Sequence, residues 1–347
     1  MEFIKGADVS SLQAMEDYGA KFYDLEGKEA DALSILRQHG VNYIRLRLFH
    51  SPTESFDAGD YCDLPHTVAM AKRVKQQGMG LLLDFHYSDF WADWKAQTIP
   101  AQWKELSAPE LEQQIYAYTY EVLQTLADAD AAPDMVQVGN EIGKGMLWEY
   151  GSITNPKQLA SFLNAGLAAV TGICEKNKLQ MQTVLHVECG ADMERTEHFF
   201  TELFKQGLQE FDEIGVSYYP FWAGSYERLR ENMENVEKKF RKRVIVMETA
   251  FPYTDVSHDA MPNIVTGQLT MEQMGLLPSV QNQKEVFSRV IREVKEAPNG
   301  RGVFYWEPAW YCKKGVGVAK GQGNEWENQA LFDEKGHALE SIRAFES

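Results

Sequence analysis

The chain has 347 residues, with 34 Lys and Arg against 51 Asp and Glu, which gives a formal net charge of −17. This length is ample for a full core, and 44% hydrophobic with 24% charged residues excludes disorder and fibrous repeats. The negative balance argues against nucleic acid or an anionic membrane as partner, because both would repel the chain. No run of 18 apolar residues occurs, so the sequence predicts no membrane span.

The N-terminal residues predict a strand and not a signal peptide, because they lack a basic region followed by an apolar one. The Cys residues follow no framework, which is typical of free thiols in a reducing compartment. They are Cys62, Cys174, Cys189 and Cys312. We therefore expect a cytoplasmic protein, with a secreted protein whose leader has been removed as the alternative. The sequence gives no indication of the oligomeric state.

Eight short apolar or β-branched segments recur along the chain, and each predicts a strand. They are residues 3–9, 43–49, 80–86, 135–140, 182–188, 213–219, 243–248 and 302–306. Apolar residues at helical spacing predict helices between them, over residues 30–39, 64–77, 110–129, 156–176, 225–240 and 280–296. Gly40 and Gly78 are the expected stops of the first two helices, and Ser225 is the expected N-cap of the fifth.

This alternation predicts an α/β fold, a (β/α)8 TIM barrel forming one domain over residues 1–347. An ideal barrel of this kind needs about 250 residues, so roughly 100 remain for enlarged βα loops. No linker divides the chain. The alternative is a doubly wound open sheet, which usually has a Gly-rich phosphate turn after its first strand. Here that position reads Asp8-Val-Ser-Ser11, which favours the barrel.

Aromatic and polar residues gather where the predicted strands end, and barrels of this type carry their chemistry at those C-terminal ends. Only Trp103 and Trp326 lie further from a strand end. The other six are Trp91, Trp94, Trp148, Trp222, Trp306 and Trp310. Aromatic faces at the mouth of a barrel suit the apolar faces of sugar rings.

Two carboxylates, Glu141 and Glu248, terminate apolar strands, where a buried charge is costly. A single such Glu is often the partner of a core Arg. Two at one barrel mouth, with Arg45 nearby, match the paired carboxylates of glycoside hydrolysis. That chemistry needs one carboxyl that holds its proton and one that stays ionised. A neighbouring Arg would lower the pKa of the second.

Eight motifs spread along the whole chain resemble those of glycoside hydrolase family 53, the endo-β-1,4-galactanases (arabinogalactan endo-β-1,4-galactosidases). Each motif is weak alone, but their order on eight predicted strands is specific. They begin at Lys5 (KGADVS), Ile44 (IRLRL), Asp84 (DFHYSDFWAD), Val136 (VQVGNE), Ser217 (SYYPFW), Val246 (VMETA), Val303 (VFYWEPAW) and Asn328 (NQALFD). The resemblance implies a retaining endo-hydrolase that cleaves galactan, type I arabinogalactan or their oligosaccharides and needs no cofactor.

The resemblance also implies roles for individual residues. Glu141 is the expected general acid/base and Glu248 the expected nucleophile, with carboxyl groups about 5–5.5 Å apart. Asn140 would bind the 2-hydroxyl of the sugar at the cleavage point. Arg45 and Tyr219 would hold the nucleophile ionised and aimed.

Further residues are expected around this pair. His86 would belong to the same polar shell, and Trp306 would floor the cleavage subsite. Alternation sends Tyr218 to the side opposite Tyr219, so Tyr218 is expected in the core. The residues expected to line neighbouring subsites are Asp89, Trp91, Trp222 and Trp310.

The chain departs from the family pattern in two loops, where Trp94-Lys95 replaces the usual Pro-Gly and Ala223 replaces the usual His. Both departures concern subsites and product length. Some members bind calcium after the seventh strand. The corresponding loop here is sparser in ligands, so we predict no metal; it offers Asp255, Ser257, His258 and Asp259. His186-Val-Glu188 resembles half of a zinc deaminase signature, but the required P-C-x-x-C is missing, which favours a supporting role for Glu188.

Two other functions remain as alternatives. One is a barrel that binds galactan without cutting it, which the altered loops would allow but the two intact Glu residues do not favour. The other is a sister activity in the same clan, such as a mannanase or a β-1,3-galactanase.

Overall fold

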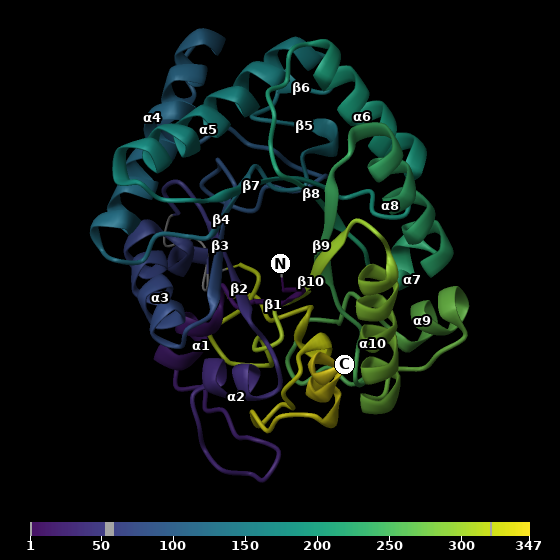
Figure 1. The fold of residues 1–347 in the computed structure, drawn as a ribbon. Coiled ribbons are helices and arrows are strands. Elements are labelled where there is room, and N and C mark those ends of the chain that lie inside the picture. Colours follow the sequence, from purple (N-terminus) through teal and green to yellow (C-terminus); the bar gives the residue numbers. More distant parts are fainter. Residues whose placement is uncertain (1, 53–58, 320) are drawn as a thin grey trace.

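The computed structural model describes residues 2–52, 59–319 and 321–347. Eight parallel strands close into a barrel in the order β1-β10-β9-β8-β7-β4-β3-β2 (Figure 1). They are β1 (Ile4–Asp8), β2 (Tyr43–Leu48), β3 (Gly80–Phe85), β4 (Met135–Val138), β7 (Gln182–Val187), β8 (Glu213–Ser217), β9 (Arg243–Thr249) and β10 (Gly300–Trp306). Each coincides with a predicted strand, and the predicted (β/α)8 barrel is confirmed.

Helices form a ring outside the barrel (Figure 1). The helices of this ring are α2 (Ala32–Gln38), α3 (Leu64–Gln76), α4 (Ala108–Asp128), α5 (Pro156–Asn177), α6 (Met193–Lys205), α8 (Tyr226–Phe240) and α10 (Val280–Glu296). Six of these match predicted helices. Helix α6 is not among the predicted helices, although Phe199, Phe200 and Leu203 give it a buried apolar face.

Shorter elements occupy the connections. The short helices are α1 (Leu12–Asp17), α7 (Pro220–Ala223) and α9 (Gly267–Met274), and β5 (Gly145–Met146) pairs with β6 (Gly151–Ser152). The 3-10 turns are η1 (Gly59–Cys62), η2 (Ala101–Trp103), η3 (Ile142–Lys144), η4 (Glu327–Gln329) and η5 (Glu340–Glu346). Within the described ranges no helix combines the length and hydrophobicity of a membrane span. All four Cys residues carry free thiols.

Side chains cap several helix starts, which satisfies backbone N–H groups that have no partner within the helix. Asp31 accepts from the Ser34 N–H at the start of α2, and Asp63 accepts from the His66 N–H at the start of α3. Ser225 occupies the N-cap position of α8, as predicted, but its side chain makes no capping hydrogen bond.

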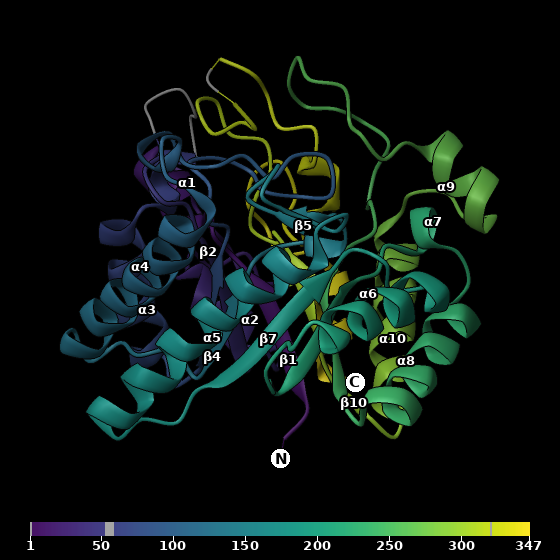
Figure 2. The same cartoon turned by 90° about the horizontal axis from the view of Figure 1, so that it is seen from above.

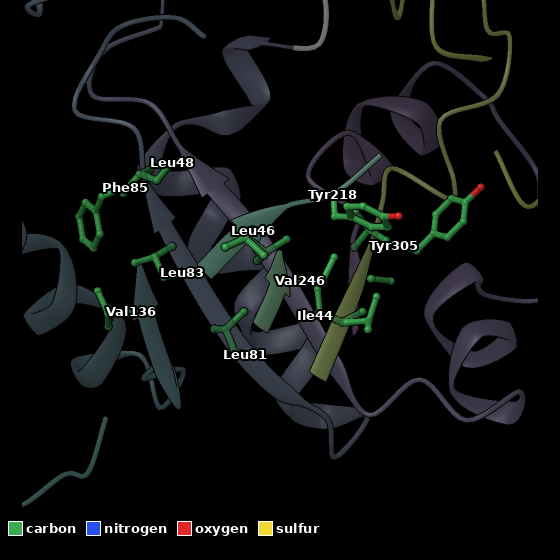
Figure 3. Close-up of a cluster of buried hydrophobic side chains, with 14 of the residues drawn as sticks. Ile44, Leu46, Leu48, Leu81, Leu83, Phe85, Val136, Tyr218, Val246 and Tyr305 are labelled. Carbon is green, nitrogen blue, oxygen red and sulfur yellow. The ribbon is translucent and has the colours of Figure 1, made fainter. Parts of the chain in front are cut away.

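Alternation along the strands divides the hydrophobic core into two parts. Outward-facing residues pack against the helices, and Figure 3 shows part of this layer, including Ile44, Leu46 and Leu83. Tyr218 belongs to this outer core, as predicted. A separate inner cluster fills the barrel: Ile4, Leu82, Met135, Val184, Ile245, Met247 and Phe304, with Tyr43 against it. The barrel interior is therefore a packed floor on which polar groups can be held.

One step further along the strands, the inward-facing residues change from apolar to polar. On β3, for example, Leu82 is followed two residues later by Asp84, and on β7 Val184 is followed by His186. The register between β8 and β9 shifts after Val216, so Ser217 pairs with Glu248. Such an irregularity re-aims side chains, and here Met247 belongs to the inner core while the next residue, Glu248, lines the cavity. The long loops gather beyond this same end of the barrel (Figure 2).

Candidate active site

A cavity of about 1560 Å³ opens at the C-terminal ends of the strands. Most residues that the sequence assigns to the site line it: Arg45, His86, Trp91, Asn140, Glu141, Tyr219, Trp222, Glu248, Trp306 and Trp310. They come from β2, β9 and β10 and from segments that follow β3, β4, β8 and β10. The closed barrel thus brings together residues that are more than 250 positions apart in the chain.

Arg45 is the hub of the polar layer beneath the cavity. Its guanidinium is 1% exposed, and each of its five N–H groups has an acceptor within 3.2 Å. The acceptors are Asp8 Oδ2, Asp84 Oδ2, Gln137 Oε1, Asn140 Oδ1 and Glu248 Oε1. A buried cation with every donor satisfied is fixed in position, so Arg45 holds its partners in register.

Glu248 is the carboxylate that Arg45 presents to the cavity. Its Oε1 accepts from Arg45 Nη1 at 2.9 Å, and its Oε2 accepts from the Tyr219 hydroxyl at 3.1 Å. Burial raises the pKa of Glu248 to about 7, and Arg45 counteracts part of this rise by stabilising the carboxylate. Burial and the neighbouring Glu248 also raise the pKa of Tyr219, which therefore remains a hydrogen-bond donor.

Glu141 lies in a different environment. Its backbone adopts a left-handed conformation (φ 47°, ψ 49°). This conformation is uncommon for non-glycine residues and occurs often at functional sites. It has no cationic partner at hydrogen-bond distance in the described part of the chain. Burial first, and the charge of Glu248 second, raise the pKa of Glu141 well above its usual range.

The two carboxyl groups are therefore close but unequal. A carboxylate oxygen of Glu141 and one of Glu248 lie within 4.8 Å of each other. Arg45 stabilises the ionised form of Glu248, whereas burial and the charge of Glu248 both oppose ionisation of Glu141, so the arrangement favours a proton on Glu141 and a charge on Glu248.

Other polar residues of this layer are missing from the sequence-based assignment. Gln137, His186 and Ser217 are buried beside the two carboxyl groups. Ser217 Oγ lies 2.6 Å from Glu141 Oε1, and His186 Nε2 lies 2.9 Å from Ser217 Oγ. The sequence could have indicated Ser217. It precedes Tyr219 by two residues, so alternation along the strand directs both side chains to the same face.

His86 also lies in this layer and contacts the loop above it. Its Nδ1 accepts from the Ala92 N–H at 3.1 Å, so its Nε2 carries the proton that it shares with Asp84 Oδ2 at 3.0 Å. His86 therefore links Asp84, a partner of Arg45, to the segment that carries Trp91.

A second arginine, Arg47, supports the aromatic floor. Its guanidinium lies 4.3 Å from the ring centre of Trp91 and 5.8 Å from that of Trp306. Below them, Arg47 Nη1 donates to Glu307 Oε1 at 2.5 Å. Burial raises the pKa of Glu307 to about 7, and Arg47 acts against this rise.

Four indole rings follow one another along the cavity: Trp91, Trp306, Trp326 and Trp222, with neighbouring ring centres 6.1, 4.8 and 6.1 Å apart. Trp222 is 49% exposed and offers an open face. In the sequence, Trp326 lies far from any predicted strand end. It reaches the site because the long segment after β10 folds back over the barrel.

Two placements differ from the sequence-based expectation. Asp89 is not among the described residues that line the cavity, because its carboxylate accepts from Ser51 N–H and Ala101 N–H and contacts His50. It holds loops together. Trp310 reaches the lining but is only 1% exposed, and its indole donates to the Val316 carbonyl. It supports Trp306 from behind and does not form an open platform.

The acidic residues of the loop after β9 already accept backbone hydrogen bonds. Asp255 accepts from the Gly267 N–H, and Asp259 accepts from the Met261 and Asn324 N–H groups, so these carboxylates fix loop structure. Asp259 also meets Cys312 and Glu327, with potential ligand atoms within 4.8 Å. Burial raises the pKa of the Cys312 thiol to about 12. Two carboxylates and a protonated thiol fall short of the six to eight oxygen ligands that calcium takes.

The sequence profile described as Glycosyl hydrolase family 53 matches residues 4–345. The chain belongs to this family. It is therefore a glycoside hydrolase, and the sequence-based resemblance is confirmed.

Relatives within family 53 span nearly the whole chain. An endo-beta-1,4-galactanase of Bacillus subtilis is 33% identical and covers 99% of this chain and 86% of its own length. An arabinogalactan endo-beta-1,4-galactanase of Cellvibrio japonicus is 32% identical and covers 99% and 91%. The solved family 53 catalytic domain of Ignisphaera aggregans superposes with a TM-score of 0.94 at 37% identity, covering 99% and 95%. A fungal β-1,4-galactanase gives a TM-score of 0.85 at 30% identity, covering 98% of each chain.

Proposed function

We propose that this family 53 enzyme is a retaining endo-β-1,4-galactanase that cleaves galactan, type I arabinogalactan or their oligosaccharides. The unequal pair Glu141 and Glu248 at the floor of an aromatic-lined cavity carries this proposal. The relatives named as β-1,4-galactanases support the choice of substrate.

Glu248 is the proposed nucleophile. Arg45 and Tyr219 each engage one of its oxygens, which aims the carboxylate and favours its ionised form. In the first step it attacks the anomeric carbon, and Glu141 gives its proton to the departing oxygen. In the second step Glu141 takes a proton from water, which attacks the same carbon and releases Glu248.

The retaining outcome is supported by the spacing of the carboxyl groups. Retaining enzymes hold them about 5–5.5 Å apart, whereas inverting enzymes leave about 6.5–9.5 Å for a water molecule. Carboxylate oxygens within 4.8 Å of each other agree with the shorter spacing. In this proposal Asn140 binds the 2-hydroxyl at the cleavage point, and Trp306 lies under that sugar.

Digestion of pectic galactan tests the proposal. Reducing ends should appear together with a ladder of short oligosaccharides, and proton NMR of the first products should show the β-anomer. Parallel digestions of mannan and of β-1,3-galactan test the sister activities. Cleavage of either in place of β-1,4-galactan would overturn the substrate, and an α-anomer would overturn the retaining mechanism.

A further inference from the structure

A continuous line of buried hydrogen bonds joins Arg45 to the proposed acid/base. Asn140 Oδ1 lies 2.8 Å from Arg45 Nη2 and 2.9 Å from His186 Nδ1. The line continues from His186 Nε2 through Ser217 Oγ to Glu141 Oε1, at 2.9 and 2.6 Å. No residue in it is more than 8% exposed, so these groups depend on one another for hydrogen bonds.

The direction of the first bonds follows from Asn140. Its Nδ2 donates to the Ala92 carbonyl at 2.9 Å and its Oδ1 accepts from Arg45, which fixes the orientation of the amide. Oδ1 is only an acceptor, so His186 Nδ1 must carry a proton. Burial, with Arg45 as the next cause, lowers the pKa of His186 well below its usual range, so the ring has only this one proton.

The remaining bonds then have one direction that leaves no polar group of the line unsatisfied. His186 Nε2 has a lone pair and must accept the single hydroxyl proton of Ser217. In this arrangement Ser217 Oγ accepts from a protonated Glu141 at Oε1, whereas it would be the donor in the same 2.6 Å contact if Glu141 were ionised. We propose that His186 and Ser217 are positioning residues that keep the proton on Glu141 by committing the Ser217 hydroxyl to His186. This inference rests on the proposed acid/base role of Glu141.

Gln137 does not change this direction. Its Oε1 accepts from Arg45 Nε, so its Nε2 is the donor. Nε2 lies 2.6 Å from Asp84 Oδ1, 3.0 Å from the Gly139 carbonyl, 3.1 Å from Asn140 Oδ1 and 3.2 Å from His186 Nδ1. The two nearest acceptors use both of its N–H groups, and a contact with Asn140 Oδ1 would again make that oxygen an acceptor.

The ionised form of Glu141 breaks the line at one contact. If Ser217 turns to donate to the carboxylate, His186 Nε2 loses its donor. If the His186 proton moves to Nε2 instead, Nδ1 and Asn140 Oδ1 face each other as two acceptors. Either way one buried polar contact is unsatisfied, which adds to the cost of ionising Glu141.

Other charges act on both ends of the line. Glu141 faces Glu248, Glu188 and Asp93, all of which oppose its ionisation. His186 faces Arg45, Asp84 and His86. These groups stay in place when the Ser217 hydroxyl is removed, so a variant isolates the effect of the line itself.

Ser217→Ala tests the proposal through the alkaline limb of the pH profile of kcat/KM on galactan, which reports loss of the Glu141 proton. Removing an acceptor from a protonated carboxyl should move this limb down by about half to one pH unit. If Ser217 instead donated to the carboxylate, the limb would move up. An upward or absent shift overturns the proposal.

His186→Leu should also lower the limb, because it frees the Ser217 hydroxyl to donate to ionised Glu141, and it should cause no further shift in Ser217→Ala. His186→Gln keeps one donor and one acceptor and should restore the limb towards the wild-type position. Thr183→Ala is the matched control. The Thr183 hydroxyl lies on β7, the strand that carries His186, but it binds Asp212 at the opposite end of the barrel. A limb that moves equally in the control would contradict the assignment.

A measurement without substrate separates this inference from the proposed function. Infrared difference spectra should show a protonated carboxyl band that disappears in Glu141→Gln and that titrates at lower pH in Ser217→Ala. If galactan is not cleaved but this titration behaves as expected, only the proposed function fails. If galactan is cleaved but the titration point stays fixed or rises, only the positioning role fails.

Discussion

Two arginines on strand β2 each neutralise a buried carboxylate, but only one of these carboxylates meets the cavity. Arg45 binds Glu248, and Arg47 binds Glu307. Burial raises the pKa of both carboxyl groups to about 7. Glu248 lines the cavity and is 7% exposed, whereas Glu307 is fully buried beneath Arg47 and Trp91.

This contrast shows that a shifted pKa alone does not identify a reacting group. The positions of the two Arg–Glu pairs distinguish them. Arg45 and Glu248 face the cavity at the end of the barrel, whereas Glu307 follows β10 and binds Ser11. The first pair is arranged for chemistry, and the second fixes the floor on which the substrate rests.

The largest expected difference between the pairs is in catalysis. Glu248→Ala should lower the rate of galactan cleavage by a factor on the order of 10⁴ or more, because the covalent step loses its nucleophile. Glu307→Gln should change the rate by less than about tenfold. The measurement is kcat/KM from reducing-sugar release, with circular dichroism to verify folding. A catalytically normal Glu248→Ala would refute the assignment.

The arginines should differ in the same direction. Arg45→Lys should lower kcat on the order of 10²-fold, because an ammonium with three donors cannot serve five acceptors at fixed positions. Arg47→Lys should mainly raise KM, since the stacked guanidinium beneath Trp91 is lost. Steady-state kinetics of both variants at one pH would reveal the split. Equal losses of kcat would contradict the distinction.

The sequence predicts all eight barrel strands, because each strand is a compact apolar run whose inward and outward residues alternate. The two carboxylates were equally visible, since Glu141 and Glu248 interrupt such runs. The sequence could not place Trp326, which reaches the cavity through a long loop. Nor could it reveal that Asp89 binds backbone N–H groups of the loops beside it, because that depends on tertiary contacts.

Stability should distinguish Glu307 in a pH-dependent way. Because the pKa of Glu307 is raised in the folded state, ionisation costs the folded protein stability as the pH rises from about 4.5 to about 7. Glu307→Gln cannot ionise, so its free energy of unfolding relative to wild type should improve by roughly 2–3 kcal/mol across this range. Urea unfolding at several pH values measures it. A relative stability that falls with pH would show that Arg47 dominates burial.

The smallest expected effect concerns the exposed end of the aromatic row. Trp222→Ala should raise KM by up to about tenfold with little change in kcat, because one stacking face for a sugar is lost while the hydrogen bonds to Glu141 and Glu248 are kept. Tyr116→Ala is the matched control, since Tyr116 is 40% exposed on α4 and outside the cavity lining. An unchanged KM for Trp222→Ala would remove Trp222 from the substrate-binding surface.

The closure of the barrel between β1 and β10 has a consequence for how the enzyme matures. Asp8, near the start of the chain, binds Arg45, and Ser11 binds Glu307, which directly follows the last barrel strand. The polar layer is therefore complete only after the final strand has left the ribosome and docked on the first. Any nascent or truncated chain that ends before β10 should be inert, and the onset of hydrolysis should report the moment at which the two ends of the barrel meet.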